Sequence, residues 1–393
     1  MFQAVPRNYK IALLVVLVLV VVRVGITQFE TAEVVRNFHK IYHPMVNAST
    51  SDLQVQVQVP KVPKEAPDPS LVPAMIIAGT QKGGTDALTL FLDNHPQLKK
   101  GFRREAHFFD FFCGELCERA VRTKSKELIE QARAKYSFEL QHDARGKDMK
   151  EKKRDSEFMF EKTPIYLFNP YVAEKTKIIV PWTKIIILLR DPVERAYSTF
   201  KMNYDRRFDK RFGKIKEEYN EKLDGKITFE RCIDIDIEKL TKAGIVGNDT
   251  FWMVDDKERE QRWLSYWDIH DEDKLTELML CDNEIGRGLY FLQLLQWFKE
   301  YNTVEDREKI YVTKSESILP DKETHVVDLK PITDFLGIDE LEVISEEKIH
   351  ATVSHFGPMK DETEQKLMEI FDPFNKKLES LLGKDWKDPW PYK

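Results

Sequence analysis

Ala74-Met-Ile-Ile-Ala-Gly79-Thr-Gln-Lys-Gly-Gly-Thr85 is the stretch of the chain that decides its fold. Residues 74–78 form an apolar run of strand type, and residues 86–92 have a helical pattern. A buried strand, a glycine-rich turn and a helix N-terminus place several backbone N–H groups and the positive end of the helix dipole at one point, which suits a phosphate. Gly83 and Gly84 allow the backbone to approach such a group closely.

The position of the lysine in this turn disfavours a kinase or an ATPase. The Walker A loop of those enzymes has Gly-Lys-Ser/Thr in sequence, whereas here Lys82 comes before the two glycines. Taken alone, a glycine-rich turn also suits tight packing without a ligand. Further phosphate contacts are therefore needed before the turn indicates a function.

Short apolar runs and helical patterns alternate along the chain from residue 74. This alternation predicts an α/β domain, residues 73–393, with a P-loop-like central parallel β-sheet flanked by helices. Two charged stretches, about residues 118–157 and 203–282, interrupt it and are predicted to be helical or loop insertions on the surface. The expected strands lie at residues 74–78, 158–160, 184–189 and 309–312.

A second phosphate contact is predicted in Leu189-Arg-Asp-Pro-Val-Glu-Arg-Ala-Tyr-Ser198, which follows a buried strand. Pro192 suits the first position of a helix. Ligands of open α/β sheets bind beyond the carboxyl ends of the strands, so Arg190 and Lys82 are expected to converge on one crevice. Two such contacts suggest a nucleotide that carries two phosphate groups.

The bulk composition excludes two classes of partner. The 393 residues contain 61 Lys and Arg against 67 Asp and Glu, a net charge of −6, so no global basic field draws the chain onto nucleic acid. The four cysteines lack the paired short spacings of a structural zinc site, and no metal is expected. Cys113 with Cys117, and Cys232 with Cys281, are candidate disulfides, with free buried cysteines as the alternative.

The N-terminal residues predict a membrane anchor. Residues 11–26 are apolar apart from Arg23, whose side chain can reach the headgroups. Basic residues precede this segment and acidic residues follow it, which predicts a cytoplasmic tail at residues 1–10 and a single-pass type II orientation. A cleaved signal peptide is the alternative, although no clear small-residue cleavage site follows.

Both alternatives place the rest of the chain across the membrane. Residues 27–72 are polar and rich in proline, which favours an extended stem. Two sequons, at Asn47 and Asn248, predict N-glycosylation and agree with a lumenal domain.

Taken together, the motifs resemble the Golgi carbohydrate sulfotransferases, in particular the heparan sulfate 3-O-sulfotransferase and N-sulfotransferase group. The Lys82-Gly-Gly-Thr85 turn is similar to the 5′-phosphosulfate loop of that family, and the segment ending at Ser198 to its 3′-phosphate motif. The resemblance covers most of residues 74–383. The other matching segments follow in the order of the family: Glu105-Ala-His-Phe-Phe-Asp110, Glu161-Lys-Thr-Pro-Ile-Tyr166, Arg287-Gly-Leu-Tyr290 and Phe374-Asn375 with Leu378.

The resemblance implies a sulfotransferase fold, a Golgi membrane location and a reaction. In that reaction a sulfuryl group moves from 3′-phosphoadenosine 5′-phosphosulfate (PAPS) to a hydroxyl or amine of a carbohydrate. A protein tyrosine or a small molecule is the alternative acceptor, and a glycan-binding module without turnover is the alternative of another class. The chemistry requires no metal, since positioning and electrostatics do most of the work in the analogous phosphoryl transfers.

The resemblance also implies a donor site. Lys82 would contact the 5′-phosphate and its bridging oxygen, while Arg190 and Ser198 would bind the 3′-phosphate. Ser354-His-Phe-Gly-Pro358 stands where the family has a basic loop, so that His355 or Gly357 is a further candidate. Backbone N–H groups toward the 5′-phosphate would come from the four residues after the lysine, Gly83, Gly84, Thr85 and Asp86.

The catalytic candidates lie in two other segments. The resemblance points to Glu105 as the base that takes the proton of the acceptor. His107 is the alternative base, because an unperturbed imidazole titrates nearest neutral pH. Asp110 is expected to orient Lys162 or the acceptor.

One basic stretch bears on the acceptor. Residues 201–216 contain seven Lys or Arg against two Asp, a local net charge of +5. The stretch either tracks an acidic polysaccharide or is a solvated helix face.

Overall fold

The structure is a computed structural model that describes residues 73–142, 158–208, 228–269, 281, 283–345 and 357–392. The predicted anchor and stem, Asn47 and His355 lie outside these residues, as do parts of both charged stretches. Among the helices described, none is both long enough and apolar enough to cross a membrane.

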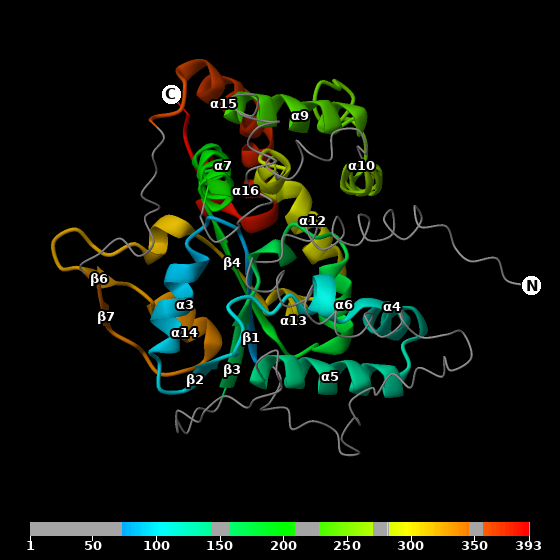
Figure 1. The fold of residues 1–393 in the computed structure, drawn as a ribbon, viewed down its shortest axis with the longest axis vertical. Coiled ribbons are helices and arrows are strands. Elements are labelled where there is room, and N and C mark those ends of the chain that lie inside the picture. The colour runs from blue at the N-terminus through cyan, green and yellow to red at the C-terminus, as the bar shows by residue number, and fades with distance from the viewer. Residues whose placement is uncertain are drawn as a thin grey trace, which may run out of the picture. The chain divides into compact units, whose positions relative to one another are not determined.

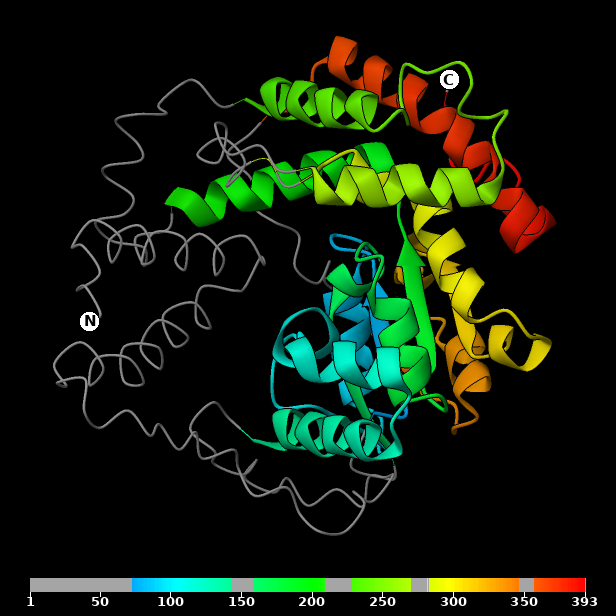
Figure 2. The ribbon, with the colours of Figure 1, turned by 90° about the vertical axis from the view of Figure 1, so that its right-hand side faces the viewer.

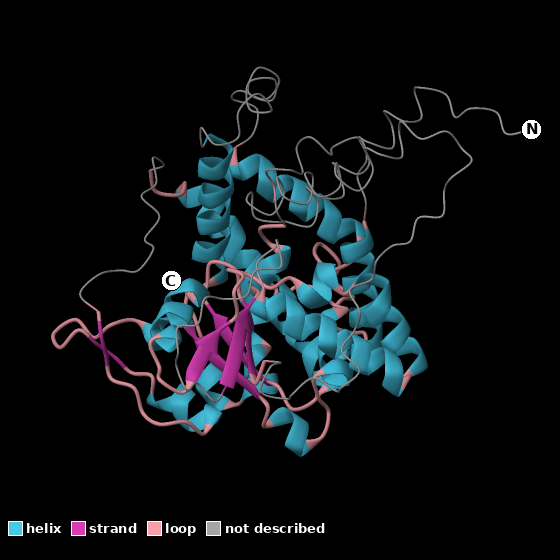
Figure 3. Cartoon of the chain, turned by 60° about the horizontal axis from the view of Figure 1, so that its bottom comes forward, coloured by secondary structure: helices cyan, strands magenta, loops and turns pink. Residues whose placement is uncertain are grey.

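A five-stranded parallel β-sheet forms the centre of the domain (Figure 3). Its order is β2-β3-β1-β4-β5, with every neighbouring pair parallel. The predicted α/β class is confirmed, and β2 is an edge strand that the sequence prediction lacked. The strands are β1 (Met75–Gly79), β2 (Leu98–Lys100), β3 (Phe158–Lys162), β4 (Lys184–Leu189) and β5 (Ile310–Lys314).

Helices cover both faces of the sheet because successive side chains of a strand point to opposite faces. Ile77 and Leu188 belong to the buried cluster on the side of α3 (Thr85–Asp93) and α14 (Lys330–Leu336). Ile76 and Ile187 belong to the cluster on the other side, which includes residues of α5 and α6 (Figure 1). The helices on that side are α4 (Gly114–Thr123), α5 (Lys126–Gln141) and α6 (Val172–Ile179).

A second group of helices lies beyond the carboxyl end of β4 (Figures 1 and 2). A two-stranded antiparallel ribbon, β6 (Val326–Val327) with β7 (Val343–Ile344), stands apart from the main sheet. The helices beyond β4 are α7 (Pro192–Phe208), α9 (Phe229–Lys242), α10 (Asp256–Asp268) and α15 (Asp361–Lys376). The other α-helices described are α12 (Tyr290–Glu300), α13 (Val304–Arg307) and α16 (Leu378–Leu382).

The described parts of the two charged stretches include helices, and some of their residues are buried. Ala120 and Tyr136 are fully buried in the first stretch, as is Cys232 in the second. Each helix therefore buries one face while its charges cover the other. The structure pairs the cysteines as Cys113–Cys117 and Cys232–Cys281.

Candidate active site

Motifs from distant parts of the chain meet at the carboxyl ends of neighbouring strands. Since β1 lies between β3 and β4, the loop after β1 is flanked by Lys162 and Arg190. Lys162 Nζ donates to Asp86 Oδ1 at 2.6 Å, and Arg190 Nη1 donates to the carbonyl oxygen of Lys82 at 3.3 Å. The two predicted phosphate motifs thus lie side by side.

The glycine-rich loop is shaped by close packing. A Cβ on Gly83 would lie 2.7 Å from Thr80 Cγ2 and 2.9 Å from the carbonyl oxygen of Leu188, so no larger residue fits. Gly84 has a left-handed φ of 83° and precedes α3. Ser315, which sequence reasoning missed, donates to the carbonyl oxygen of Gly83 at 2.7 Å from the end of β5.

The N-terminus of α3 is suited to an anion. The first N–H groups of a helix have no acceptor within the helix, and no side chain of the described residues caps this one. The amides of Thr85 and Asp86 belong to that first turn. Amides and helix dipole together favour a negatively charged ligand at this point.

A row of alternating charges extends from this helix across the site, and we call it the charge row. It consists of three acidic and three basic side chains joined by contacts of 2.6 to 3.2 Å. Lys162 is at the centre, and only 1% of its side chain is exposed. In order, the members are Arg104, Asp86, Lys162, Glu105, His107 and Asp110.

The pKa values of the charge row follow from burial and from its ion pairs. Burial alone would raise the pKa of Glu105, but Lys162 and His107 outweigh it and hold that pKa well below its usual range. Burial would lower the pKa of His107, but Asp110 and Glu105 outweigh it and raise the pKa to about 10. His107 is therefore an imidazolium at neutral pH, and an imidazolium has no lone pair to accept a proton.

Asp86 differs from its sequence prediction, which gave it only a backbone role. Its carboxylate accepts from Lys162 at 2.6 Å and from Arg104 Nη2 at 2.8 Å. Burial would raise the pKa of Asp86, and the two cations lower it overall. Asp86 thus connects the helix after the phosphate loop to the lysine of β3.

Arg190 lies at the corner between β4 and α7, which begins at Pro192 as predicted. Its Nη2 donates to Glu194 Oε2 at 2.7 Å. Tyr290, from the Arg287-Gly-Leu-Tyr290 segment, donates to the carbonyl oxygen of Arg190 at 2.8 Å. Backbone and side chain of Arg190 are therefore held by different elements.

The remaining predicted residues lie around α7 or outside the site. Ser198 is half-buried on α7, and its neighbour Tyr197 donates to the carbonyl oxygen of Gly357 at 2.9 Å. Of the basic stretch, only the side chains of residues 201–203 are described. Asn248 is half-buried, and its Oδ1 accepts from the hydroxyl of Thr250 at 2.7 Å.

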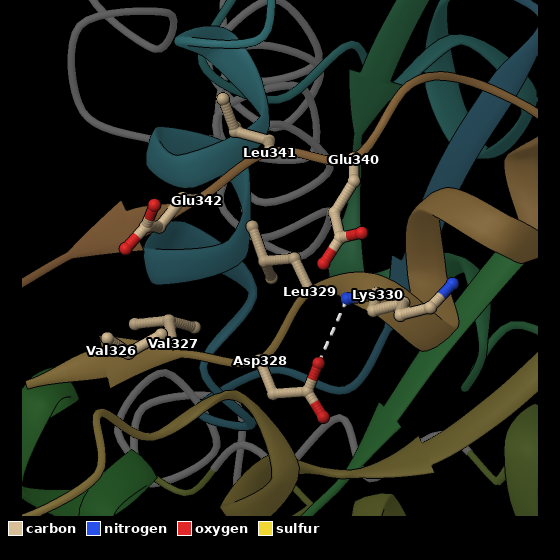
Figure 4. Close-up of a pocket in the computed structure, with 8 residues that line it drawn as sticks. All are labelled: Val326, Val327, Asp328, Leu329, Lys330, Glu340, Leu341 and Glu342. Atoms are coloured by element: carbon tan, nitrogen blue, oxygen red, sulfur yellow. Dashed lines mark hydrogen bonds between the residues drawn. The ribbon is translucent and has the colours of Figure 1, made fainter. Parts of the chain in front are cut away.

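A cavity of about 480 Å³ lies beside the β6–β7 ribbon and the start of α14 (Figure 4). It is lined by residues 326–330 and 340–342, none of which belongs to the charge row or to the phosphate loop. Within the described residues, no group of three His, Cys, Asp or Glu side chains is arranged to hold a metal ion.

The fold and the site define a class of protein. Ligands of open α/β sheets bind beyond the carboxyl ends of the strands, and the glycine-rich loop, Arg190 and the charge row all lie there. The family model described as "Sulfotransferase domain" matches residues 73–390, and the chain belongs to this family of transferases. The family assignment made from the motifs is thereby confirmed.

The relatives include carbohydrate sulfotransferases. The chain is 26% identical over 344 residues to the membrane-associated sulfotransferase kil1 of Dictyostelium discoideum, covering 80% of this chain and 66% of that protein. It is 30% identical over 138 residues to the human heparan sulfate glucosamine 3-O-sulfotransferase 3B1, covering 35% of this chain and 28% of that protein. The chain thus spans about two thirds or less of the length of these relatives.

The solved structures that are similar to this chain include the crystal structure of a sulfotransferase from Alicyclobacillus acidocaldarius. Its sequence identity to this chain is 19%, with a TM-score of 0.43, and the match covers 80% of this chain and 98% of that one.

Proposed function

We propose that this protein transfers a sulfuryl group from PAPS to a hydroxyl or amine of a carbohydrate. The observation that carries the proposal is the position of the Lys162–Glu105 pair, which Asp86 joins directly to the phosphate loop. A cation for the sulfuryl oxygens and a carboxylate for the acceptor proton are thus adjacent to the place where the donor would bind.

The donor side of the site fits a nucleotide with two phosphate groups. Lys82 and the amides of Gly84, Thr85 and Asp86 would hold the 5′-phosphosulfate, because no described side chain caps the start of α3. The predicted Gly83 amide is engaged instead, since it donates to the carbonyl oxygen of Thr80 at 2.9 Å. Arg190 and Ser198 would hold the 3′-phosphate. A phosphate would take the place of the Glu194 carboxylate, which accepts from Arg190 at 2.7 Å in this structure. PAPS supplies the activated sulfuryl group.

Glu105 is the residue that we assign as the base. His107 is protonated at neutral pH, with a pKa raised to about 10, and therefore cannot accept the proton. Glu105 gains basicity as Lys162 is drawn toward the negative charge that develops on the sulfuryl oxygens. The proton of the acceptor then moves to Glu105, the new bond from sulfur to the acceptor forms, and the bond from sulfur to the phosphate oxygen breaks.

His107 and Asp110 hold Glu105 in place. His107 Nδ1 and Asp110 Oδ2 are 2.8 Å apart, and His107 Nε2 lies 3.2 Å from Glu105 Oε2. The protonated ring thus fixes one carboxylate oxygen of Glu105, while Lys162 contacts the other.

The acceptor and the location are supported by the relatives. The heparan sulfate enzymes are named for glucosamine sulfation, and kil1 is described as membrane-associated. These names support a carbohydrate acceptor and a membrane association. A Golgi location, with residues 11–26 as type II anchor and residues 27–72 as stem, is assigned from the resemblance of the motifs and from the N-terminal sequence. The basic stretch at residues 201–216 fits an anionic glycan. Charge reversal within residues 206–211 should then raise the KM for anionic glycans alone.

A panel assay with radiolabelled PAPS tests the acceptor class. We expect label in glycans rather than in tyrosine peptides or small hydroxyl compounds. Label in peptides or small molecules alone would move the acceptor to another class. Glycan binding without transfer to any acceptor would contradict the proposal.

Two variants test the roles within the site. Glu105→Gln should lower turnover while the affinity for adenosine 3′,5′-bisphosphate, measured by calorimetry, stays nearly intact. Lys82→Ala should lower turnover and also weaken the affinity for adenosine 3′,5′-bisphosphate. Lys322 is exposed, and Lys322→Ala is the matched control. Turnover within a few-fold of wild type in Glu105→Gln would exclude Glu105 as the base. Unchanged affinity in Lys82→Ala would remove Lys82 from the donor site.

A further inference from the structure

A fully buried carboxylate, that of Glu161, lies beneath the charge row. Glu161 precedes Lys162 in β3, so the two side chains point to opposite faces of the sheet. It is 2% exposed, and within the described residues its hydrogen bonds go to hydroxyl groups outside the charge row. A buried carboxylate costs several kcal/mol unless its oxygens accept hydrogen bonds, so its presence calls for an explanation.

Both oxygens of Glu161 accept a hydroxyl proton. Tyr136 donates to Oε1 at 2.6 Å, and Thr163 donates to Oε2 at 2.6 Å. Because the Thr163 proton is directed to Glu161, the lone pairs of its oxygen are free to accept. That oxygen accepts the N–H of Ala106 at 2.9 Å and the N–H of His107 at 3.2 Å.

The segment held in this way is the one that carries the acidic and imidazole groups of the site. Tyr166 continues the support, since its hydroxyl accepts the N–H groups of Phe108 at 2.8 Å and Phe109 at 3.2 Å. His107 has a left-handed φ of 48°. A non-glycine residue adopts this conformation at a cost of about 1 kcal/mol and keeps it only where the surroundings enforce it.

We propose that Glu161 is a positioning residue: its carboxylate orients the Thr163 hydroxyl, which in turn holds the backbone that carries Glu105 and His107. The inference rests on the proposed function, because positioning matters for turnover only if those two residues act in transfer. An amide in place of the carboxylate would bring an N–H₂ group to one of the two hydroxyls. Thr163 would then lose its acceptor or reverse its hydroxyl, and its hold on the two amides would weaken.

Kinetics of Glu161→Gln and Thr163→Val test the inference. We expect kcat to fall by about 10- to 100-fold, as for a small misplacement of catalytic groups. The KM for PAPS and the affinity for adenosine 3′,5′-bisphosphate should stay within about threefold of wild type, because the phosphate loop is separate from this network. Thr163→Ser keeps the hydroxyl and should restore kcat to within about threefold.

Thr183→Val is the matched control. Thr183 is fully buried as well, and its hydroxyl donates to the carbonyl oxygen of Pro73 at 2.8 Å, away from the charge row. Loss of kcat in Thr183→Val equal to that in Thr163→Val would mean that any buried hydroxyl has this effect, which overturns the inference. The inference is also overturned if Glu161→Gln and Thr163→Val fold and keep wild-type kcat, or if these substitutions change KM alone.

Amide hydrogen exchange provides a readout that does not depend on activity. The N–H groups of Ala106 and His107 should exchange about tenfold faster in Thr163→Val than in wild type and Thr163→Ser, while those of β4 stay unchanged. If wild-type protein transfers sulfate to no acceptor, the proposed function fails and this exchange pattern still decides the positioning role. Equal protection in all the variants would overturn it.

Discussion

Lys162 donates a hydrogen bond to Glu105 across 2.9 Å at the carboxyl end of β3. The lysine shares its charge with Asp86, 2.6 Å away, so one cation serves two carboxylates. Lys162 therefore lowers the pKa of Glu105 and also supplies a positive charge within the site. Removing Glu105 would leave Lys162 paired with Asp86, and removing Lys162 would leave Glu105 beside His107, so each change alters the charge balance of the site.

Lys162→Met should lower kcat by at least about 100-fold, since it removes the cation that stabilises charge in the transition state. It should also raise the pKa of Glu105, so the acidic limb of the pH-rate profile moves to higher pH. The check is kcat against pH for wild type and variant. Lys184→Met is the control, because Lys184 is half-buried but donates to the carbonyl oxygen of Phe335, outside the site, at 2.6 Å. An unmoved acidic limb would contradict the coupling.

His107 links the site to the pH dependence of stability. Its pKa rises from 6.5 in the unfolded chain to about 10 in the folded protein. Its contribution to stability is thus complete below pH 6.5 and is lost as the pH rises through 10. Denaturant unfolding at several pH values in this window should show wild type losing stability relative to His107→Gln. Parallel curves for the two proteins would show that the imidazole is neutral in the folded state.

The parts of the fold and site that could be predicted from the sequence have local signals. The first strand, the glycine turn and the start of α7 at Pro192 each occupy a few adjacent residues, and the structure has them in place. Arg190 could be placed beside the loop because the carboxyl ends of parallel strands share one edge. By contrast, β2 has only three residues, Leu98–Lys100, too few for an apolar pattern.

The parts that could not be predicted depend on contacts between distant residues. Asp86 and Lys162 are 76 positions apart, and nothing in either segment signals their ion pair. The charge on His107 depends on Asp110 and Glu105 enclosing the ring, whereas sequence reasoning used the unperturbed pKa. Likewise, Tyr136 is buried in a charged stretch because its ring stacks on Phe108, while its hydroxyl donates to the carboxylate of Glu161 on β3.

The two glycines of the phosphate loop should respond differently to substitution. Gly83→Ala places a Cβ 2.9 Å from two backbone oxygens, those of Thr80 and Leu188, and should destabilise the protein by about 2 kcal/mol. A Cβ on Gly84 would meet only Ile318 Cδ1, at 3.4 Å, but the φ of Gly84 is +83°. Gly84→Ala should therefore cost about 1 kcal/mol and Gly84→Asn less, because asparagine tolerates this conformation. Thermal unfolding checks the order, and equal losses for alanine and asparagine would contradict the role of φ.

The two disulfides should contribute unequally to stability in the oxidised protein. Cys232 and Cys281 are 49 residues apart, so their bond removes far more freedom from the unfolded chain than a bond between Cys113 and Cys117, which are 4 apart. The loop-entropy relation gives about 4 kcal/mol for the longer loop and about 2 kcal/mol for the shorter one. Unfolding in denaturant of the Cys232→Ser/Cys281→Ser and Cys113→Ser/Cys117→Ser double variants measures both, and each variant serves as the control for the other. If the Cys113→Ser/Cys117→Ser variant loses more free energy of unfolding than the other, packing around Cys113 and Cys117, both nearly fully buried, outweighs chain entropy.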